Sequence, residues 1–314
     1  MIDKVLAGAA LAWLLAAPLR AGDEDRCLRE IVVLGAGQDA GAPQIGNADD
    51  DGPQLLPSSL ALIDREAGAR YLFDASPEIT AQMAALDRIE PPGEGLGIDG
   101  IFLTHAHIGH YLGLAYLGRE AAGASGVPVY AMPRMAEFLR GNGPWSQLVE
   151  PGQIEIKKFE DGNVSNPVFL APDLVVIAFR VPHRDEFSET AGFGIVTPGQ
   201  RALYLPDLDS WDTFEEESGQ SLEDMLEFVD HAFVDATFWN DNELQGRDMS
   251  EVPHPRIRAV MDRLSGLSPE ERGKIRFIHY NHTNPVRDPQ SAESREVSER
   301  GFHVARRGDR VCLD

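Results

Sequence analysis

Short apolar runs of strand length recur along the whole chain, with turn-forming residues between them. This pattern predicts strands at 28–34, 59–63, 71–73, 100–103, 127–131, 153–159, 174–181, 192–196, 202–205, 232–234, 275–278, 302–305 and 311–313. Stretches with helical spacing predict helices at 77–86, 111–121, 133–141, 221–228, 255–264 and 291–300. Strands interleaved with helices indicate an α/β architecture whose sites lie at strand ends.

The chain reads as one folded domain. It has 314 residues, of which 43% are hydrophobic and 25% charged, a balance that excludes disorder and fibres. No repeat, low-complexity tract or long hydrophilic linker divides it. We therefore expect a single domain over 22–314.

The first residues have the pattern of a secretory leader. Lys4 precedes an apolar stretch at 5–15, and Ala21 is a small residue that could precede a cleavage point. We expect a signal peptide at 1–21, export to the periplasm and no stable membrane anchor, because the stretch is too short to span a bilayer.

Cys27 and Cys312 are the only cysteines. In an oxidising compartment they could form a disulfide that joins the chain ends, and two unpaired thiols are the alternative.

The charge balance limits the partners. The chain has 51 Asp and Glu against 28 Lys and Arg, a formal charge of −23, and no concentrated basic patch. Such a surface repels polyanions, so nucleic acid is excluded as a partner. We expect a small-molecule substrate, and the sequence leaves the oligomeric state open.

The strongest chemical signal follows the strand at 100–103. It is the run Thr104-His105-Ala106-His107-Ile108-Gly109-His110. Three imidazoles within six residues are typical of a metal site, and His105 and His107 point the same way if extended geometry persists.

Further candidate ligands stand at the ends of later apolar runs: His183, Asp207, His279 and His282. With the triplet they supply the nitrogen and carboxylate donors that zinc, iron or manganese uses. His254 lies in a polar segment, 239–255, that could cover a pocket. We interpret it as a surface residue or a neighbour of the ligands, not as a ligand.

Several short motifs occur in a recognisable order: Val33-Leu34-Gly35, Ser58-Ser59-Leu60, Leu72-Phe73-Asp74-Ala75-Ser76-Pro77, Thr190-Ala191-Gly192-Phe193, Tyr204-Leu205-Pro206-Asp207, Asp235-Ala236-Thr237-Phe238-Trp239 and His279-Tyr280-Asn281-His282-Thr283-Asn284-Pro285. With the histidine run, they resemble the metallo-β-lactamase fold superfamily. Within it, the chain looks most like the coenzyme pyrroloquinoline quinone synthesis protein B family.

The resemblance implies a four-layer αβ/βα sandwich with a metal centre at one edge between two sheets. It also implies the roles of the candidate residues: His105, His107 and His183 hold a first metal, Asp207 bridges, and His110 and His279 hold a second metal. Asp74 matches an acid that is a structural hydrogen-bonding partner in the superfamily. Asp207 and His110 are the residues expected to take part in catalysis.

Gly109 departs from the family motif, which has Asp at this position, so the second metal loses one donor. Three arrangements remain open. A single metal could be held by the first set alone. His282 could fill the gap. The remaining set of two histidines and one carboxylate could instead form an iron site with open positions. An Asp at position 109 is expected to raise the content of the second metal.

The resemblance and the full first set favour a hydrolase with one or two zinc ions, or alternatively iron or manganese. Metal-activated water would attack a small-molecule ester, lactam or phosphodiester. The alternatives are an iron-dependent oxidase or hydroxylase related to quinone cofactor synthesis, and a binding protein in which the change to Gly109 accompanies loss of catalysis.

Overall fold

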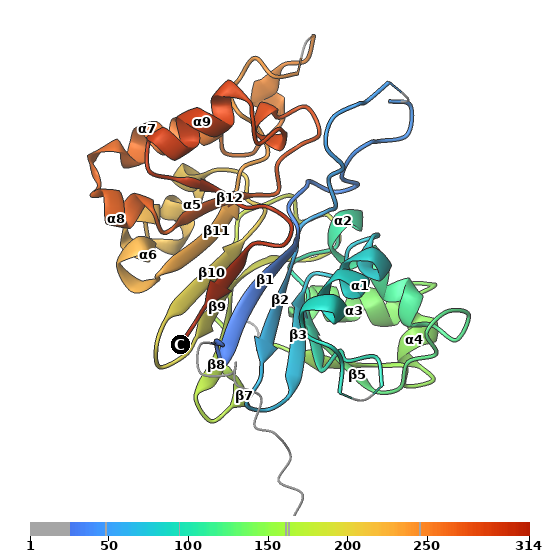
Figure 1. Ribbon diagram of the computed structural model, residues 1–314. Coiled ribbons are helices and arrows are strands. Elements are labelled where there is room, and N and C mark those ends of the chain that lie inside the picture. Colours follow the sequence, from blue (N-terminus) through green and yellow to red (C-terminus); the bar gives the residue numbers. More distant parts are fainter. Residues whose placement is uncertain (1–25, 48, 94, 161, 163, 245) are drawn as a thin grey trace, which may run out of the picture.

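The computed structural model describes residues 26–47, 49–93, 95–160, 162, 164–244 and 246–314. Its strands form two seven-stranded sheets that lie face to face (Figure 1). The first sheet, in spatial order, consists of β14 (Arg310–Cys312), β1 (Arg29–Gly35), β2 (Ser59–Asp64), β3 (Ala69–Phe73), β4 (Gly100–Phe102), β5 (Val127–Ala131) and β6 (Ile154–Lys158). The second consists of β13 (His303–Val304), β12 (Ile275–Ile278), β11 (His231–Asp235), β10 (Arg201–Leu205), β9 (Thr190–Val196), β8 (Leu174–Val181) and β7 (Val168–Ala171).

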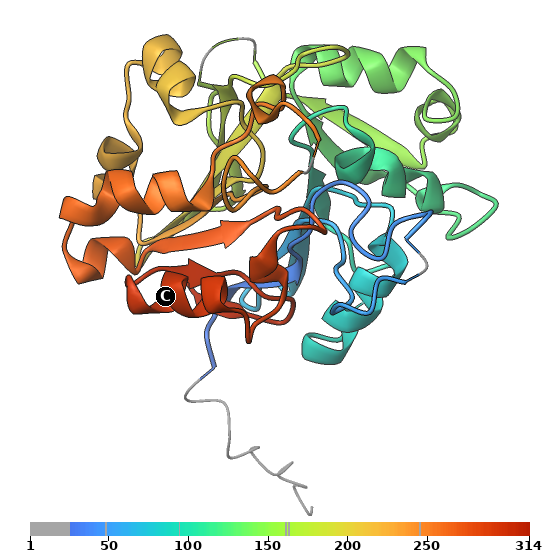
Figure 2. The same cartoon turned by 90° about the horizontal axis from the view of Figure 1, so that it is seen from above.

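Helices cover the outer face of each sheet, which gives four layers (Figure 2). Beside the first sheet lie α1 (Ile79–Ile89), α2 (Ile108–Tyr111), α3 (Pro133–Gly141) and α4 (Ser146–Val149). Beside the second lie α5 (Trp211–Ser218), α6 (Leu222–Phe228), α7 (Ile257–Arg263), α8 (Pro269–Arg272) and α9 (Ala292–Glu299). Short 3-10 helices occupy Leu112–Leu117, Met249–Glu251, Leu264–Gly266 and Pro285–Arg287. The predicted four-layer αβ/βα sandwich is confirmed.

The core lies between the two sheets and is rich in aromatic rings. Phe73 of β3 and Phe102 of β4 meet Phe193 of β9 across the sheets, with ring centroids 5.5 and 5.7 Å away. Every residue of β1 is buried, because both faces of its sheet are covered. A smaller core, which includes Ile63 of β2 and Leu86 of α1, fills the space between the first sheet and its helices.

All the predicted strands are present, and β7 is an additional one at the sheet edge. The helix predicted at 111–121 is wrong. The chain forms only the short α2 and then a 3-10 helix at Leu112–Leu117. Gly113 packs so closely that a Cβ on it would lie 2.1 Å from the carbonyl oxygen of Ser76, and glycine also lowers helix propensity. The helices α4, α5 and α8 were not predicted.

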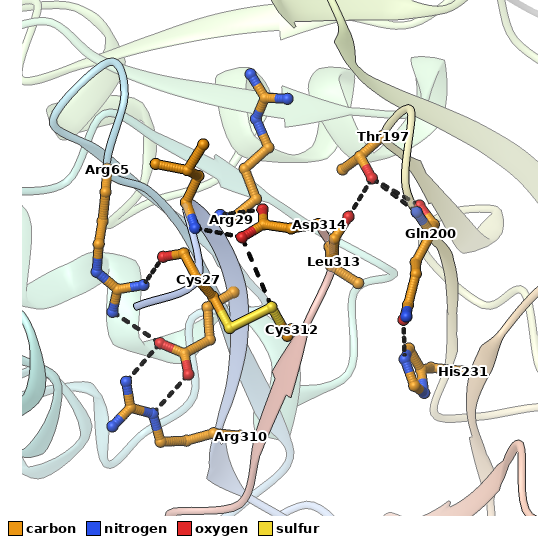
Figure 3. Close-up of a disulfide and its surroundings, with 12 residues drawn as sticks. Cys27, Arg29, Arg65, Thr197, Gln200, His231, Arg310, Cys312, Leu313 and Asp314 are labelled. Atoms are coloured by element: carbon orange, nitrogen blue, oxygen red, sulfur yellow. Dashed lines mark hydrogen bonds and ion pairs between the residues drawn. A yellow bond between two sulfur atoms is a disulfide. The ribbon is translucent and has the colours of Figure 1, made fainter. Parts of the chain in front are cut away.

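A disulfide joins the two ends of the described chain. Cys27 precedes β1, and Cys312 lies on β14, which pairs with β1 in antiparallel register (Figure 3). The two Cα atoms are 5.6 Å apart. Beside the bridge, Glu30 of β1 is 2.7 Å from Arg65 and 2.6 Å from Arg310. Of the two alternatives left by the sequence, the structure has the disulfide and not the unpaired thiols.

The predicted signal peptide at 1–21 lies outside the described residues. Among the helices of the described part, none is both long and apolar enough to cross a membrane.

Candidate metal centre

Strands from both sheets end at the same edge of the sandwich. β8, β10, β11 and β12 run in the same direction, because β8 and β10 are each antiparallel to β9, and β11 and β12 are parallel to β10. His183 follows the end of β8, Asp207 follows β10 and His279 follows β12. In the first sheet, β3 and β4 are parallel and lead into Asp74 and the histidine run. Side chains far apart in sequence therefore converge at this edge.

One compact group consists of His105, His107, His183 and Asp207, whose ligand atoms all lie within 4.8 Å of one another. Nε2 of His105 is 2.8 Å from Nδ1 of His107 and 3.4 Å from Oδ2 of Asp207. Nε2 of His183 is 3.2 Å from the same carboxylate oxygen. The strand β4 ends at Phe102, so a turn and not continued strand geometry brings the first two rings together. This group has the composition of the predicted first metal set.

The other ring nitrogen of each of these histidines contacts an oxygen that fixes the ring. The hydroxyl of Thr104 lies 3.0 Å from Nδ1 of His105. Glu186 lies 3.0 Å from Nε2 of His107, and Asp209 lies 2.9 Å from Nδ1 of His183. Such contacts are typical of metal-binding histidines, because they set the tautomer and the orientation of the ring. The sequence analysis did not identify Asp209.

A second group consists of His110, Asp207 and His279, all buried. Oδ2 of Asp207 is 4.0 Å from Nε2 of His110 and 3.8 Å from Nε2 of His279. Neither Nε2 atom has a hydrogen-bond partner in the described part of the chain. A buried polar nitrogen without a partner is unfavourable, and a cation between the two rings would supply one.

In the second group, Nδ1 of each histidine also contacts an oxygen that orients the ring. Nδ1 of His110 is 2.8 Å from Asp74, whose other carboxylate oxygen accepts hydrogen bonds from the backbone and side chain of Thr104. Nδ1 of His279 is 3.1 Å from the hydroxyl of Thr237. Asp74 and His279 both have positive φ angles, 65° and 66°, and such strained backbone tends to occur at functional sites. Asp74 therefore acts as a hydrogen-bonding partner of a ligand, as the resemblance implied.

Of the two interpretations given for His254, the structure has the neighbour of the ligands and not the surface residue. It is buried, and its Nδ1 lies 2.9 Å from Asp235 and 3.2 Å from Oδ1 of Asp207. These three residues form a third compact group. Its position in a polar segment suggested surface exposure. The available signal was Asp235, which ends β11 much as Asp207 follows β10.

His282 does not join the centre, contrary to the sequence prediction. Its Nδ1 lies 2.8 Å from the side-chain oxygen of the adjacent Asn281. It is a member of none of the compact groups found among the described residues. His279, whose φ is +66°, places its Nε2 3.8 Å from Oδ2 of Asp207. His279 is thus the histidine of this segment that reaches the second group.

Gly109 has no room for a side chain. A Cβ on it would lie 2.5 Å from Cα of Asp39 and 2.8 Å from the Asp39 carbonyl oxygen. An Asp at position 109 would therefore displace backbone, and the prediction that this substitution alone raises metal content has no support in the structure.

The electrostatics of the centre are dominated by Asp207. Burial raises its pKa, but the neighbouring imidazoles, chiefly those of His183, His279 and His254, outweigh burial and hold the pKa well below its usual range. Burial lowers the pKa of His183, whereas the carboxylates of Asp207 and Asp209 raise it to about 9. In the metal-free chain, protonated imidazole thus balances the buried carboxylate. His105 differs, since burial holds its pKa well below the usual range and keeps it neutral.

The donors fit a divalent metal. Imidazole nitrogens and carboxylate oxygens suit zinc, iron or manganese, and the inward-facing atoms are buried and share one carboxylate. His105, His107, His183 and Asp207 would hold a first ion, and His110, His279 and Asp207 would hold a second.

The similarity of the chain to known proteins agrees with its fold and with this group of metal-binding side chains. Residues 69–280 match the family described as "Beta-lactamase superfamily domain". The chain belongs to the β-lactamase superfamily. It is 27% identical over 313 residues to coenzyme PQQ synthesis protein B of Ruegeria pomeroyi, covering 90% of this chain and 100% of that protein. It is also 27% identical over 320 residues to the protein of the same name from Methylococcus capsulatus, covering 90% and 99%.

Solved structures of the superfamily share the architecture. The Zn(2+)-bound PqqB of Methylobacterium extorquens aligns with a TM-score of 0.72 and 21% identity, covering 90% of this chain and 99% of that chain. A diphosphatase from the PhnP family aligns with a TM-score of 0.60 and 21% identity, covering 90% and 96%. At these identities the likeness shows the fold alone.

Proposed function

We propose that this member of the superfamily is a metal-dependent hydrolase of a small-molecule ester, lactam or phosphodiester. The observation that carries the proposal is the position of Asp207. Its carboxylate belongs both to the group with His105, His107 and His183 and to the group with His110 and His279. Such an arrangement suits one or two zinc ions, with iron or manganese as alternatives. A bound ion would act as a Lewis acid and lower the pKa of water.

The residues of the chain have separate tasks in this proposal. The outer contacts of Glu186, Asp209 and Asp74 orient the histidine rings, so the donor atoms are in place before an ion binds. His254 holds a proton at Nδ1 between the carboxylates of Asp207 and Asp235. His254 also lines a cavity beside the centre, and we expect its Nε2 to donate a proton to the leaving group.

A cavity beside the centre supports a small-molecule substrate. It has a volume of about 680 Å³ and is lined by His254, Asp209, Arg247, Arg256 and neighbouring residues of the segment 239–255. Volumes of this order are typical of small-molecule sites. The net charge of −23 argues against nucleic acid.

Hydrolysis is tested with zinc-loaded protein and a panel of chromogenic esters, lactams and phosphodiesters. We expect turnover of at least one class, and we expect it to fall to background in His183→Ala and after chelation. Metal-loaded protein with no turnover across the panel would contradict the proposal. The matched control is His303→Gln on the edge strand β13, which should retain full activity.

An iron-dependent oxidation is the second candidate. The observation that favours it is the second group, because two histidines and one carboxylate match the iron sites of oxygenases. Iron-loaded protein that consumes oxygen with phenolic substrates, and shows no hydrolysis with zinc, would favour this function.

We also propose that the protein is exported to the periplasm. The leader pattern of the sequence and the disulfide between Cys27 and Cys312 support this location, because disulfides persist in oxidising compartments. Fractionation of cells that express the full chain tests it. Recovery of the uncleaved chain in the cytosol would contradict it.

A further inference from the structure

The loop after β1 lies between the two segments that carry the second group. Gly37 forms a β-bridge with Tyr280, and the backbone N–H of Gln38 donates to the carbonyl of Tyr280 at 3.0 Å. This fixes the loop beside the residue that follows His279. On its other side, the backbone of Asp39 touches Gly109, the residue before His110. Asp39 is therefore held next to both histidines of the second group by its position in the fold.

Asp39 adopts a conformation that few residues other than glycine take. Its φ is +41°, in the left-handed region, where a residue with a side chain is under strain. A turn closes around it, since the N–H of Gly41 donates to the carbonyl of Gln38 at 2.8 Å. Asp is one of the few residues with a side chain that occur in this region, and Gly would adopt it without strain.

The Asp39 carboxylate is only partly exposed and accepts no hydrogen bond from any residue in the described part of the chain. Its negative charge reaches His110, where it contributes, after burial and the larger effects of Asp74 and Asp207, to the raised pKa of that imidazole. The carboxylate is thus available to a ligand close to the second group.

The contact between Asp39 and Gly109 indicates that the Asp39 carboxylate could take the place of a carboxylate on residue 109. Cα of Asp39 lies 2.5 Å from the point where a Cβ on residue 109 would stand. A carboxylate that extends from Asp39 therefore starts close to where one on residue 109 would start. We propose that Asp39 supplies the carboxylate ligand that Gly109 lacks and completes the second metal position with His110, His279 and Asp207. The inference rests on the proposed metal-dependent function and deepens it.

Asp39 is not a member of the compact groups in the metal-free chain. The second ion must therefore order its carboxylate, and we expect this ion to bind more weakly than the first. The two ions should be separable in a titration.

The experiment titrates metal-free protein with zinc and measures bound zinc per chain after dialysis. For the wild type we expect two equivalents, and for Asp39→Asn one equivalent, with the affinity for the second reduced by about 100-fold. Asp39→Gly is the second variant. It removes the carboxylate and the strain together, so it should bind one equivalent while its metal-free melting temperature is not lowered. The matched control Asp49→Asn, an exposed acid of the same loop, should bind two equivalents.

Two equivalents with unchanged affinity in both Asp39 variants would overturn the role of Asp39 and leave the metal-dependent function standing. One equivalent in the wild type would also overturn it, in favour of a single-metal site. No zinc in the wild type would instead contradict the proposed function itself.

Discussion

Nδ1 of His254 lies 3.2 Å from Oδ1 of Asp207, the carboxylate that both metal groups share. Asp235 holds the same nitrogen from the other side at 2.9 Å. Burial lowers the pKa of His254, but the two carboxylates outweigh burial and raise it to about 10. His254 thus stays protonated at neutral pH without being a member of either set of metal ligands.

Replacement of His254 should separate catalysis from metal binding. We expect His254→Gln to lower kcat by about 100-fold or more, the usual contribution of a positioned acid, while zinc per chain stays unchanged. Steady-state kinetics and metal analysis on the same preparation measure both quantities. Loss of metal together with activity would assign His254 a ligand role instead.

Zinc binding should release protons at pH 7. His183 has a pKa of about 9 in the metal-free chain and must lose its proton to bind an ion. Its raised pKa adds stability to the metal-free fold that is complete below about pH 6.5, the ordinary value, and is lost as the pH rises through about 9. Calorimetry in buffers of different ionisation enthalpy should show the release. Identical binding enthalpies in all buffers would show that no proton is released.

Asp209 should support the first metal through His183. Its carboxylate lies 2.9 Å from Nδ1 of His183, so Asp209→Asn removes the charge that orients the ring. We expect the zinc affinity to fall by about 10- to 100-fold. Competition with a chromogenic chelator measures it. Glu216→Gln, an exposed acid on α5, serves as the control and should leave the affinity unchanged. An equal affinity in both variants would remove Asp209 from the metal centre.

The disulfide should contribute to stability because it closes nearly the whole chain, since Cys27 and Cys312 are separated by 285 positions in the sequence. We expect the double variant Cys27→Ser/Cys312→Ser to lose about 2–5 kcal/mol of unfolding free energy. Urea denaturation of metal-free protein measures the loss. The same denaturation midpoint with and without the bridge would mean that the terminal strand pairing of β1 and β14 suffices.

The strands could be predicted from sequence because strands buried on both faces contain continuous apolar runs, as in β1 and β2. The edge strand β7 was missed although its four residues, Val168–Ala171, are all apolar; it is short and partly exposed. The helix α5 was missed although its signals are present, since Ser210 caps its start and Gly219, with φ +72°, ends it. Its acidic composition obscured its apolar face, which buries Trp211 and Phe214.

For the candidate site, the sequence pattern identified the residues that directly follow strands, because a shared strand direction brings such positions together. It left open whether His254 is a surface residue or a neighbour of the ligands, and it did not identify Asp39. Each reaches the centre through a loop, and the conformation of a loop depends on contacts with distant segments, such as that of Asp39 with Gly109. The error at His282 has a related origin. His279 has a left-handed backbone, and residue spacing reveals neither that conformation nor which imidazole of the segment turns inward.

Anomalous diffraction at the zinc edge from crystals of zinc-loaded protein tests the metal centre most directly. We predict a strong anomalous peak enclosed by His105, His107, His183 and Asp207, and a second peak beside His110 and His279 at higher zinc concentration. The absence of any peak within bonding distance of Asp207 would contradict the metal centre and the chemistry proposed for it.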